Sequence, residues 1–277
     1  MKKLVLAAAT LLALHSGIKA QALRTPAPSV KQVITQEFGL GTIELNYSRP
    51  SAKGRKVMGD LVPFDKVWRT GANQATTLSF TDDVIIGGQA IKPGKYGLLS
   101  IPGANEWTLI ITKDLNVTSP AAYKQENDVV RVKAKAMQMP GNMETFTMQF
   151  ANISNSACEL HLMWENTAVA LPISTNIDGK VMKQIDEAMN QDNRPYFAAA
   201  QYYFDNGKDL GKAKEWVDKA IAAQPTAFWM TLLKARIHAK MGDKAGARTA
   251  ADKTIELATA AKNDDYIKMA QDLKKTL

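Results

Sequence analysis

The sequence predicts an α+β protein with two parts: an N-terminal antiparallel β-sandwich over residues 21–175 and a C-terminal all-α domain of helical hairpins over residues 176–277. Three observations lead to this prediction. Apolar residues recur with period two as far as Ile173, and after it they recur with the period of a helix, about 3.6 residues. The first 20 residues have the composition of a secretory signal peptide. The remaining length is sufficient for two hydrophobic cores without disulfides.

Residues 1–20 are predicted to be a signal peptide that is cleaved after Ala20. Lys2 and Lys3 precede the apolar run Leu4–Leu14, and Ala20 supplies the small residue before the cut. The run is too short to span a bilayer, and no later segment is apolar enough to do so. We therefore expect a mature protein without a membrane span, soluble in the periplasm or secreted.

The charge of the mature chain argues against a nucleic-acid partner. The formal net charge is +8, and loss of the three lysines of the signal peptide leaves +5. Lysine and arginine are spread along the chain and are not clustered with aromatic residues that would stack on bases. The single cysteine, Cys158, has no partner for an internal disulfide. Its place on the apolar side of a predicted strand indicates an inert core residue.

The strands of the sandwich are predicted from short segments in which apolar and polar residues alternate. Such alternation places one face of a strand on a core and the other towards water, as in antiparallel sheets. Gly87-Gly88, Pro93-Gly94 and Pro140-Gly141-Asn142 are turn signals between these segments. Many short strands without intervening helices favour a sandwich. The segments are Ile43–Tyr47, Leu78–Phe80, Trp107–Ile111, Val130–Ala134, Phe146–Phe150 and Leu160–Trp164.

The helical part is predicted from apolar faces and from an internal repeat. Helical spacing is found in three segments, Ile177–Ala188, Leu210–Ala220 and Tyr266–Leu277. A pattern of four residues recurs 34 positions later: Ala213, Asp218, Lys219 and Ile221 are followed by Ala247, Asp252, Lys253 and Ile255. A helix–turn–helix period of this length, with small residues where helices cross, resembles tetratricopeptide repeats. Two such repeats are fewer than usually stand alone, so we expect the tail to dock on the sandwich or on another chain.

Three blocks of the β part carry a family signature. The first contains Arg49-Pro50-Ser51, Lys53-Gly54-Arg55, Leu61-Val62-Pro63 and Val67-Trp68-Arg69-Thr70-Gly71-Ala72-Asn73. The second is Ile91–Leu98 with Ile101-Pro102 and Trp107, and the third includes Phe146, Leu162-Met163-Trp164-Glu165 and Pro172-Ile173. From about Ala22 to Ile173 the chain resembles domain-of-unknown-function family 2911, a group of secreted bacterial proteins. The resemblance implies a β-rich exported domain and transfers no catalytic residue. Gln74 stands where an acidic residue is common in the family, which counts against a metal or acid–base role there.

The candidate site is the long connection Pro50–Ala75. Ordered loops of this length are uncommon and are frequently functional. Its basic residues outnumber the two local carboxylates, Asp60 and Asp65, and a guanidinium suits a carboxylate, sulfate or phosphate. An amide at Asn73 can orient a neutral polyol. The predicted ligand-binding residues are Arg49, Lys53, Arg55, Trp68, Arg69 and Asn73.

A purely structural interpretation of this loop is open beside the ligand site and is the one that the sequence favours. Arg69 and Asn73 would then bond the loop's own carbonyl groups while Trp68 fills the core, because buried main-chain acceptors need partners. The two remaining histidines, His161 and His238, lie in different parts, so we predict no shared metal site.

The functional hypothesis is an exported, non-enzymatic binding or scaffold protein without a cofactor. Its sandwich would recognise a polar or anionic small molecule or a glycan, and its helical tail would contact a protein. The alternative is a hydrolase acting on cell-envelope or imported polymer, with Arg69 and Asn73 as a clamp. That alternative lacks a nucleophile motif, and Glu165, Asp60 and Asp65 would have to serve as acid or base.

Overall fold

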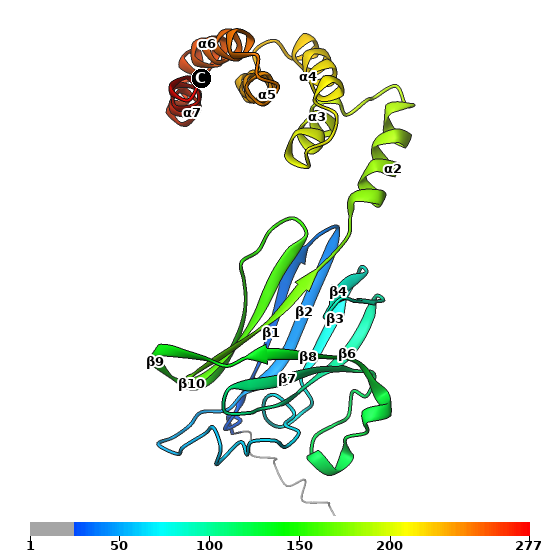
Figure 1. The fold of residues 1–277 in the computed structure, drawn as a ribbon, viewed down its shortest axis with the longest axis vertical. Coiled ribbons are helices and arrows are strands. Elements are labelled where there is room, and N and C mark those ends of the chain that lie inside the picture. Colours follow the sequence, from blue (N-terminus) through cyan, green and yellow to red (C-terminus); the bar gives the residue numbers. More distant parts are fainter. Residues whose placement is uncertain (1–24) are drawn as a thin grey trace, which may run out of the picture. The chain divides into compact units, whose positions relative to one another are not determined.

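The computed structural model describes residues 25–277, which form two units, one ending at Asn176 and the other beginning at Ile177 (Figure 1). An N-terminal two-sheet β region is followed by helices, so the predicted α+β class is confirmed. The predicted signal peptide and its cleavage after Ala20 fall outside the described residues.

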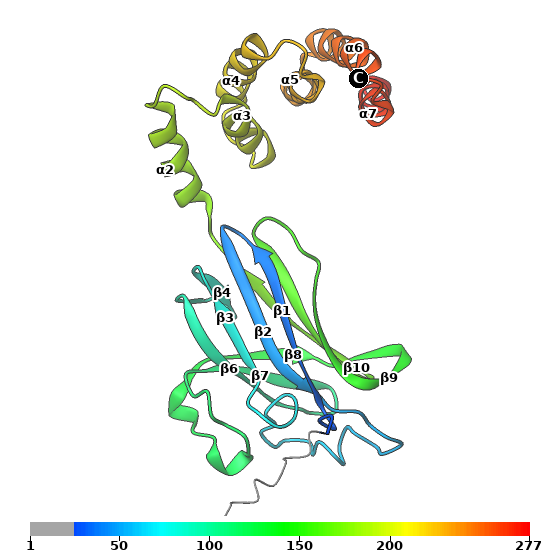
Figure 2. The same cartoon turned by 180° about the vertical axis from the view of Figure 1, so that it is seen from behind.

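The larger sheet of the β unit has six strands in the described residues, and every neighbouring pair is antiparallel. Ile34 lies opposite Leu45, and Leu45 lies opposite Leu78, so apolar side chains of consecutive strands share one face. Figure 2 shows the first strands side by side in blue to cyan. In spatial order the strands are β1 (Val30–Phe38), β2 (Gly41–Arg49), β3 (Thr77–Phe80), β6 (Gly94–Ile101), β7 (Glu106–Thr112) and β8 (Asp128–Lys135).

The second sheet contains, in spatial order, β5 (Gln89–Ile91), β4 (Val84–Ile86), β10 (Ala157–Ser174) and β9 (Met137–Ala151). The chain reverses within β10: the main-chain N–H of Thr175 donates to the carbonyl oxygen of Ser156 at 2.9 Å, although a straight strand would hold them far apart. Glu165, near the middle of β10, has φ 50°, the left-handed conformation that tight reversals use. The two runs of β10 are thereby placed side by side.

The core of the β unit lies between the two sheets. Its largest fully buried side chains come from both sheets and include Trp107, Trp164, Tyr47 and Phe146. The alternation predicted for Leu160–Trp164 is confirmed, with Cys158 on the same buried face.

Strand β7 departs from the predicted alternation, because both of its faces are buried. Ile110 was expected to face water, yet it is 0% exposed and packs with Leu99 and Val117. Val67 from the β2–β3 connection and Tyr123 from the β7–β8 connection pack against this cluster. Two short helical turns in the latter connection, η1 (Pro120–Ala122) and η2 (Gln125–Asn127), were not predicted. Two long connections therefore cover the outer face of the larger sheet at β6 and β7.

The second unit is built of helical hairpins. Leu210 and Lys244, the first residues of α4 and α6, are 34 positions apart, and Ala213 and Ala247 are both fully buried, as the repeat predicts. Asp209 and Asp243 cap these helices by accepting N–H bonds from Lys212 and Gly246. The helices are α2 (Asp178–Met189), α3 (Tyr196–Asp205), α4 (Leu210–Ala223), α5 (Phe228–Lys240), α6 (Lys244–Ala260) and α7 (Asp264–Lys275).

The separate cores of the two units lead to a first prediction. Residues 21–175 produced alone should fold, because the sandwich core draws only on residues up to Ile173. Far-ultraviolet circular dichroism of this segment should show a β-type spectrum. A helical or disordered spectrum would contradict the division.

Candidate functional site

The connection Pro50–Ala75 is folded onto the sandwich through its own apolar residues. Val57, Met58 and Val62 are buried in the sandwich core, and Met58 and Val62 form an isolated bridge with each other. The loop therefore has a packed base, which fixes the positions of the charged residues between its anchors.

Trp68 is the central anchor of this loop. Its main chain exchanges two hydrogen bonds with Ser100 of β6, at 2.7 and 3.0 Å. Its ring stacks on Trp164 at 5.8 Å between centroids and meets Phe146 edge-on at 4.9 Å. The indole N–H donates to the carbonyl oxygen of Gly71 at 3.2 Å. Trp68 thus packs, partly buried, against the end of the core between the two sheets.

Two glutamates of the second sheet hold the loop by its main chain. The carboxylate of Glu165 accepts N–H bonds from Val57 at 2.8 Å and Met58 at 3.0 Å, one on each oxygen. Glu144 accepts from the main-chain N–H of Lys53 at 2.7 Å. From the sequence, Glu165 is predicted only as an acid or base for the hydrolase. No sequence pattern marks Glu165 for this role, because the strand reversal beside it is a feature of the tertiary structure.

Three of the predicted ligand-binding residues bond the protein itself. Arg49 donates from Nε to the carbonyl oxygen of Phe146 at 3.2 Å. Arg55 donates from Nε to the carbonyl oxygen of Ala52 at 2.8 Å, and Asn73 donates from Nδ2 to that of Ser29 at 3.0 Å. These are the bonds expected of scaffolding. Lys53 is exposed, and among the described residues its ammonium has no hydrogen-bond or ion-pair partner.

Arg69 differs from Arg49 and Arg55 in the bonding of its Nε. Nη1 donates to the carbonyl oxygen of Thr118 in the β7–β8 connection. Nε is buried and has no acceptor among residues 25–277. A buried guanidinium N–H without an acceptor is uncommon in proteins and is costly.

Arg69 and Trp68 together line a cavity of about 440 Å³ between the two long connections. Its walls are mostly apolar, and Lys66 adds a second cation at an exposed position. No carboxylate, histidine or cysteine is among the lining residues of this cavity. A largely apolar cavity that contains a guanidinium group suits an anion with an apolar body. The lining residues are Leu61, Val62, Pro63, Lys66, Val67, Trp68, Arg69, Thr118, Ser119 and Pro120.

The structure therefore brings Trp68 and Arg69 together at one cavity and leaves the other four predicted residues outside its lining. It also restricts the chemistry of the hydrolase alternative. Both oxygens of Glu165 accept main-chain N–H bonds, which a free acid or base would not do.

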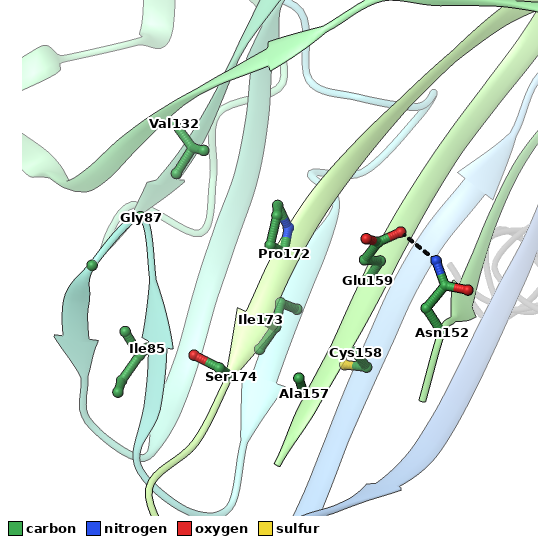
Figure 3. Close-up of a pocket in the computed structure, with 11 residues that line it drawn as sticks. Ile85, Gly87, Val132, Asn152, Ala157, Cys158, Glu159, Pro172, Ile173 and Ser174 are labelled. Atoms are coloured by element: carbon green, nitrogen blue, oxygen red, sulfur yellow. Dashed lines mark hydrogen bonds between the residues drawn. The ribbon is translucent and has the colours of Figure 1, made fainter. Parts of the chain in front are cut away.

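A second cavity, of about 350 Å³, lies beside the two runs of β10 (Figure 3). Cys158 and Glu159 line it from one run, and Ile173 lines it from the other. Burial raises the pKa of Cys158 to about 11, so its thiol stays protonated at neutral pH. Hydrogen bonds from His161 and from Asn152 lower the pKa of Glu159. The carboxylate of Glu159 is thus already hydrogen-bonded to two neighbouring side chains.

Residues 25–277 contain neither a cluster of potential metal ligands nor a candidate membrane-spanning helix. Among residues 25–277 there is no group of three or more His, Cys, Asp or Glu side chains that could hold a metal ion. Each histidine instead pairs with one carboxylate. Nε2 of His161 lies 2.7 Å from Oε2 of Glu159, and Nδ1 of His238 lies 2.7 Å from Oδ2 of Asp243. In the same range no helix has the length and apolar character needed to cross a membrane.

Comparison with known families gives one match. The family model described as "Protein of unknown function (DUF2911)" matches residues 29–173, which is the β unit almost to its last strand residue. Comparisons with curated proteins and with solved structures find no match.

Proposed function

The chain belongs to the DUF2911 family of proteins of unknown function, and we propose that its N-terminal unit is a non-catalytic binding domain that holds a small organic anion beside Arg69. The proposal includes export of the protein, which the composition of residues 1–20 supports.

The observation that carries the proposal is the incomplete bonding of Arg69. Arg49 and Arg55 each donate from Nε to a main-chain carbonyl, whereas the buried Nε of Arg69 has no acceptor among the described residues. The carbonyl of Thr118 occupies one of five guanidinium donors. A carboxylate bound in the cavity would accept hydrogen bonds from guanidinium N–H groups that have no acceptor within the protein.

The lining of the cavity limits the class of ligand. Leu61, Pro63 and Pro120 offer apolar contact, and no amide side chain lines the cavity. A glycan, which needs several directed polar partners, fits this lining less well than a carboxylate on a small apolar body. We therefore favour an aromatic or aliphatic carboxylate of modest size.

The helical unit is proposed to supply a contact surface for another protein. The ring of Phe228 lies 5.1 Å from that of Trp229 and 4.8 Å from that of Tyr266. Trp229 is 38% exposed, and clustered aromatic residues are enriched at protein interfaces.

The decisive test compares Arg69→Ala with the parent in thermal unfolding, with benzoate as the probe. Benzoate should stabilise the parent by about 2.7 kcal/mol at 100 times its dissociation constant, because a ligand that binds the folded state shifts the equilibrium. It should have no effect on Arg69→Ala. Without benzoate, the substitution should cost about 1 kcal/mol, since it removes one hydrogen bond to Thr118.

Two controls sharpen this experiment. Arg55→Ala removes an exposed arginine of the same loop and should keep the full benzoate effect. Benzyl alcohol, which has the ring without the charge, should stabilise neither protein. If Arg69→Ala lost about 3 kcal/mol or more, the cost of leaving several buried groups unpaired, and benzoate did not stabilise the parent, Arg69 would serve only to hold the loop in place.

A further inference from the structure

The helical unit contains a groove that is independent of the anion cavity. It lies among α4, α5 and α6 and has a volume of about 380 Å³. Ile221, Ala250 and the aliphatic parts of longer side chains give it a largely apolar lining. His238 of α5 also lines it and is only 7% exposed.

The imidazole of His238 is held in one orientation by the start of α6. Its Nδ1 lies 2.7 Å from Oδ2 of Asp243, the residue that caps α6. Hydrogen bonds from Gly246 and from His238 lower the pKa of Asp243, so this group is a carboxylate that can only accept. Nδ1 therefore carries the proton, and in the neutral ring Nε2 presents a lone pair.

Gly246 makes this arrangement sterically feasible. A Cβ at this position would lie 2.4 Å from Nδ1 of His238 and 2.8 Å from its Cε1. Both distances are shorter than real Cβ contacts, so only glycine lets the imidazole lie against the first turn of α6. The close approach brings the ring to the groove in a fixed position.

Nε2 of His238 is buried and has no hydrogen-bond partner in the described part of the chain. The other polar side chains of the groove are engaged. Thr231 donates to the carbonyl oxygen of Phe228, and Thr249 donates to that of Ala245. An unpaired acceptor in an apolar groove is a position that a ligand donor would satisfy.

The charges at the groove indicate an uncharged ligand. Lys234 pairs with Asp218 at 2.7 Å, and Lys253 pairs with Glu256 at 2.6 Å. Both ammonium groups are thus neutralised locally, and no carboxylate lines the groove to receive a cation.

We propose that this groove binds a small uncharged molecule with an apolar body and one hydroxyl group, which donates its hydrogen bond to Nε2 of His238. Because Nε2 is buried, entry of the ligand includes a rotamer change of a lining side chain. The hydroxyl replaces the missing partner, and the apolar body covers Ile221 and Ala250.

The test uses the mature full-length chain without a histidine tag, at about pH 8, where an ordinary imidazole is neutral. The probes are p-cresol and its methyl ether, which share an apolar ring but differ in the donor. Binding is followed by the imidazole carbon–proton signals in nuclear magnetic resonance, assigned to His238 with the variant His238→Phe. Signals of His161, in the other unit, serve as the internal control.

We expect p-cresol to shift the His238 signals in a saturable manner and to bind about tenfold more tightly than the ether, the ratio that one hydrogen bond to a buried acceptor provides. His161→Phe should leave this ratio unchanged, and folded His238→Phe should bind both probes equally. Equal affinity of the two probes for the parent would overturn the proposal, as would the absence of saturable shifts at His238. The ratio of the two affinities in the parent protein tests the proposed hydrogen bond even if His238→Phe does not fold.

Discussion

Replacing Trp68 with alanine should lower the free energy of unfolding by about 3 kcal/mol, the lower end of the usual cost of truncating a large aromatic side chain in a core, because Trp68 is partly buried. The ring contacts Trp164, Phe146 and Trp107 at once, so its removal opens a cavity that rigid neighbours cannot close. The loop would also lose the indole bond to Gly71. Chemical denaturation of residues 21–277, followed by tryptophan fluorescence and far-ultraviolet circular dichroism, measures the change.

Trp229→Ala is the matched control for this experiment. Trp229 is a partly exposed tryptophan of the helical unit, and its truncation should change stability by about 1 kcal/mol or less. A similarly small effect of Trp68→Ala would show that the loop does not depend on its central anchor.

Replacing Glu165 with alanine should cost about 2–5 kcal/mol, because it leaves the main-chain N–H groups of Val57 and Met58 without acceptors at a buried position. Glu165→Gln keeps one amide oxygen as an acceptor and should fall between this variant and the parent. Urea unfolding of the three proteins measures the series.

A second readout reports on the loop itself. Lys53, Arg55 and Lys56 are exposed trypsin sites within it, so Glu165→Ala should accelerate cleavage there when the loop separates from the sheet. Glu144→Ala is the control: Glu144 holds one exposed N–H, that of Lys53, and its loss should cost about 1 kcal/mol. Equal cleavage rates in both variants and the parent would show that Glu165 does not hold the loop.

The sequence by itself determined the buried faces of the helices and of the strands other than β7. Side chains two positions apart on a strand share a face, so the pattern around Leu160 placed Cys158 in the core before any contact was known. The 34-residue recurrence placed Ala213 and Ala247 at equivalent positions of two helices, and both side chains are fully buried. The first family block also singled out the loop that forms the cavity.

Only the tertiary structure decided which of the predicted arginines is left with a buried donor that has no acceptor. Arg49 and Arg69 have the same chemistry, and each donates to a main-chain carbonyl, a group that every residue carries and no sequence pattern marks. Phe146 lies 97 positions from Arg49, and Val57 lies 108 positions from Glu165. The burial of Ile110 likewise depended on two connections that pack over its strand. Periodicity is local and can be read along the chain, whereas the pairing of a donor with an acceptor depends on which distant segments the fold brings together.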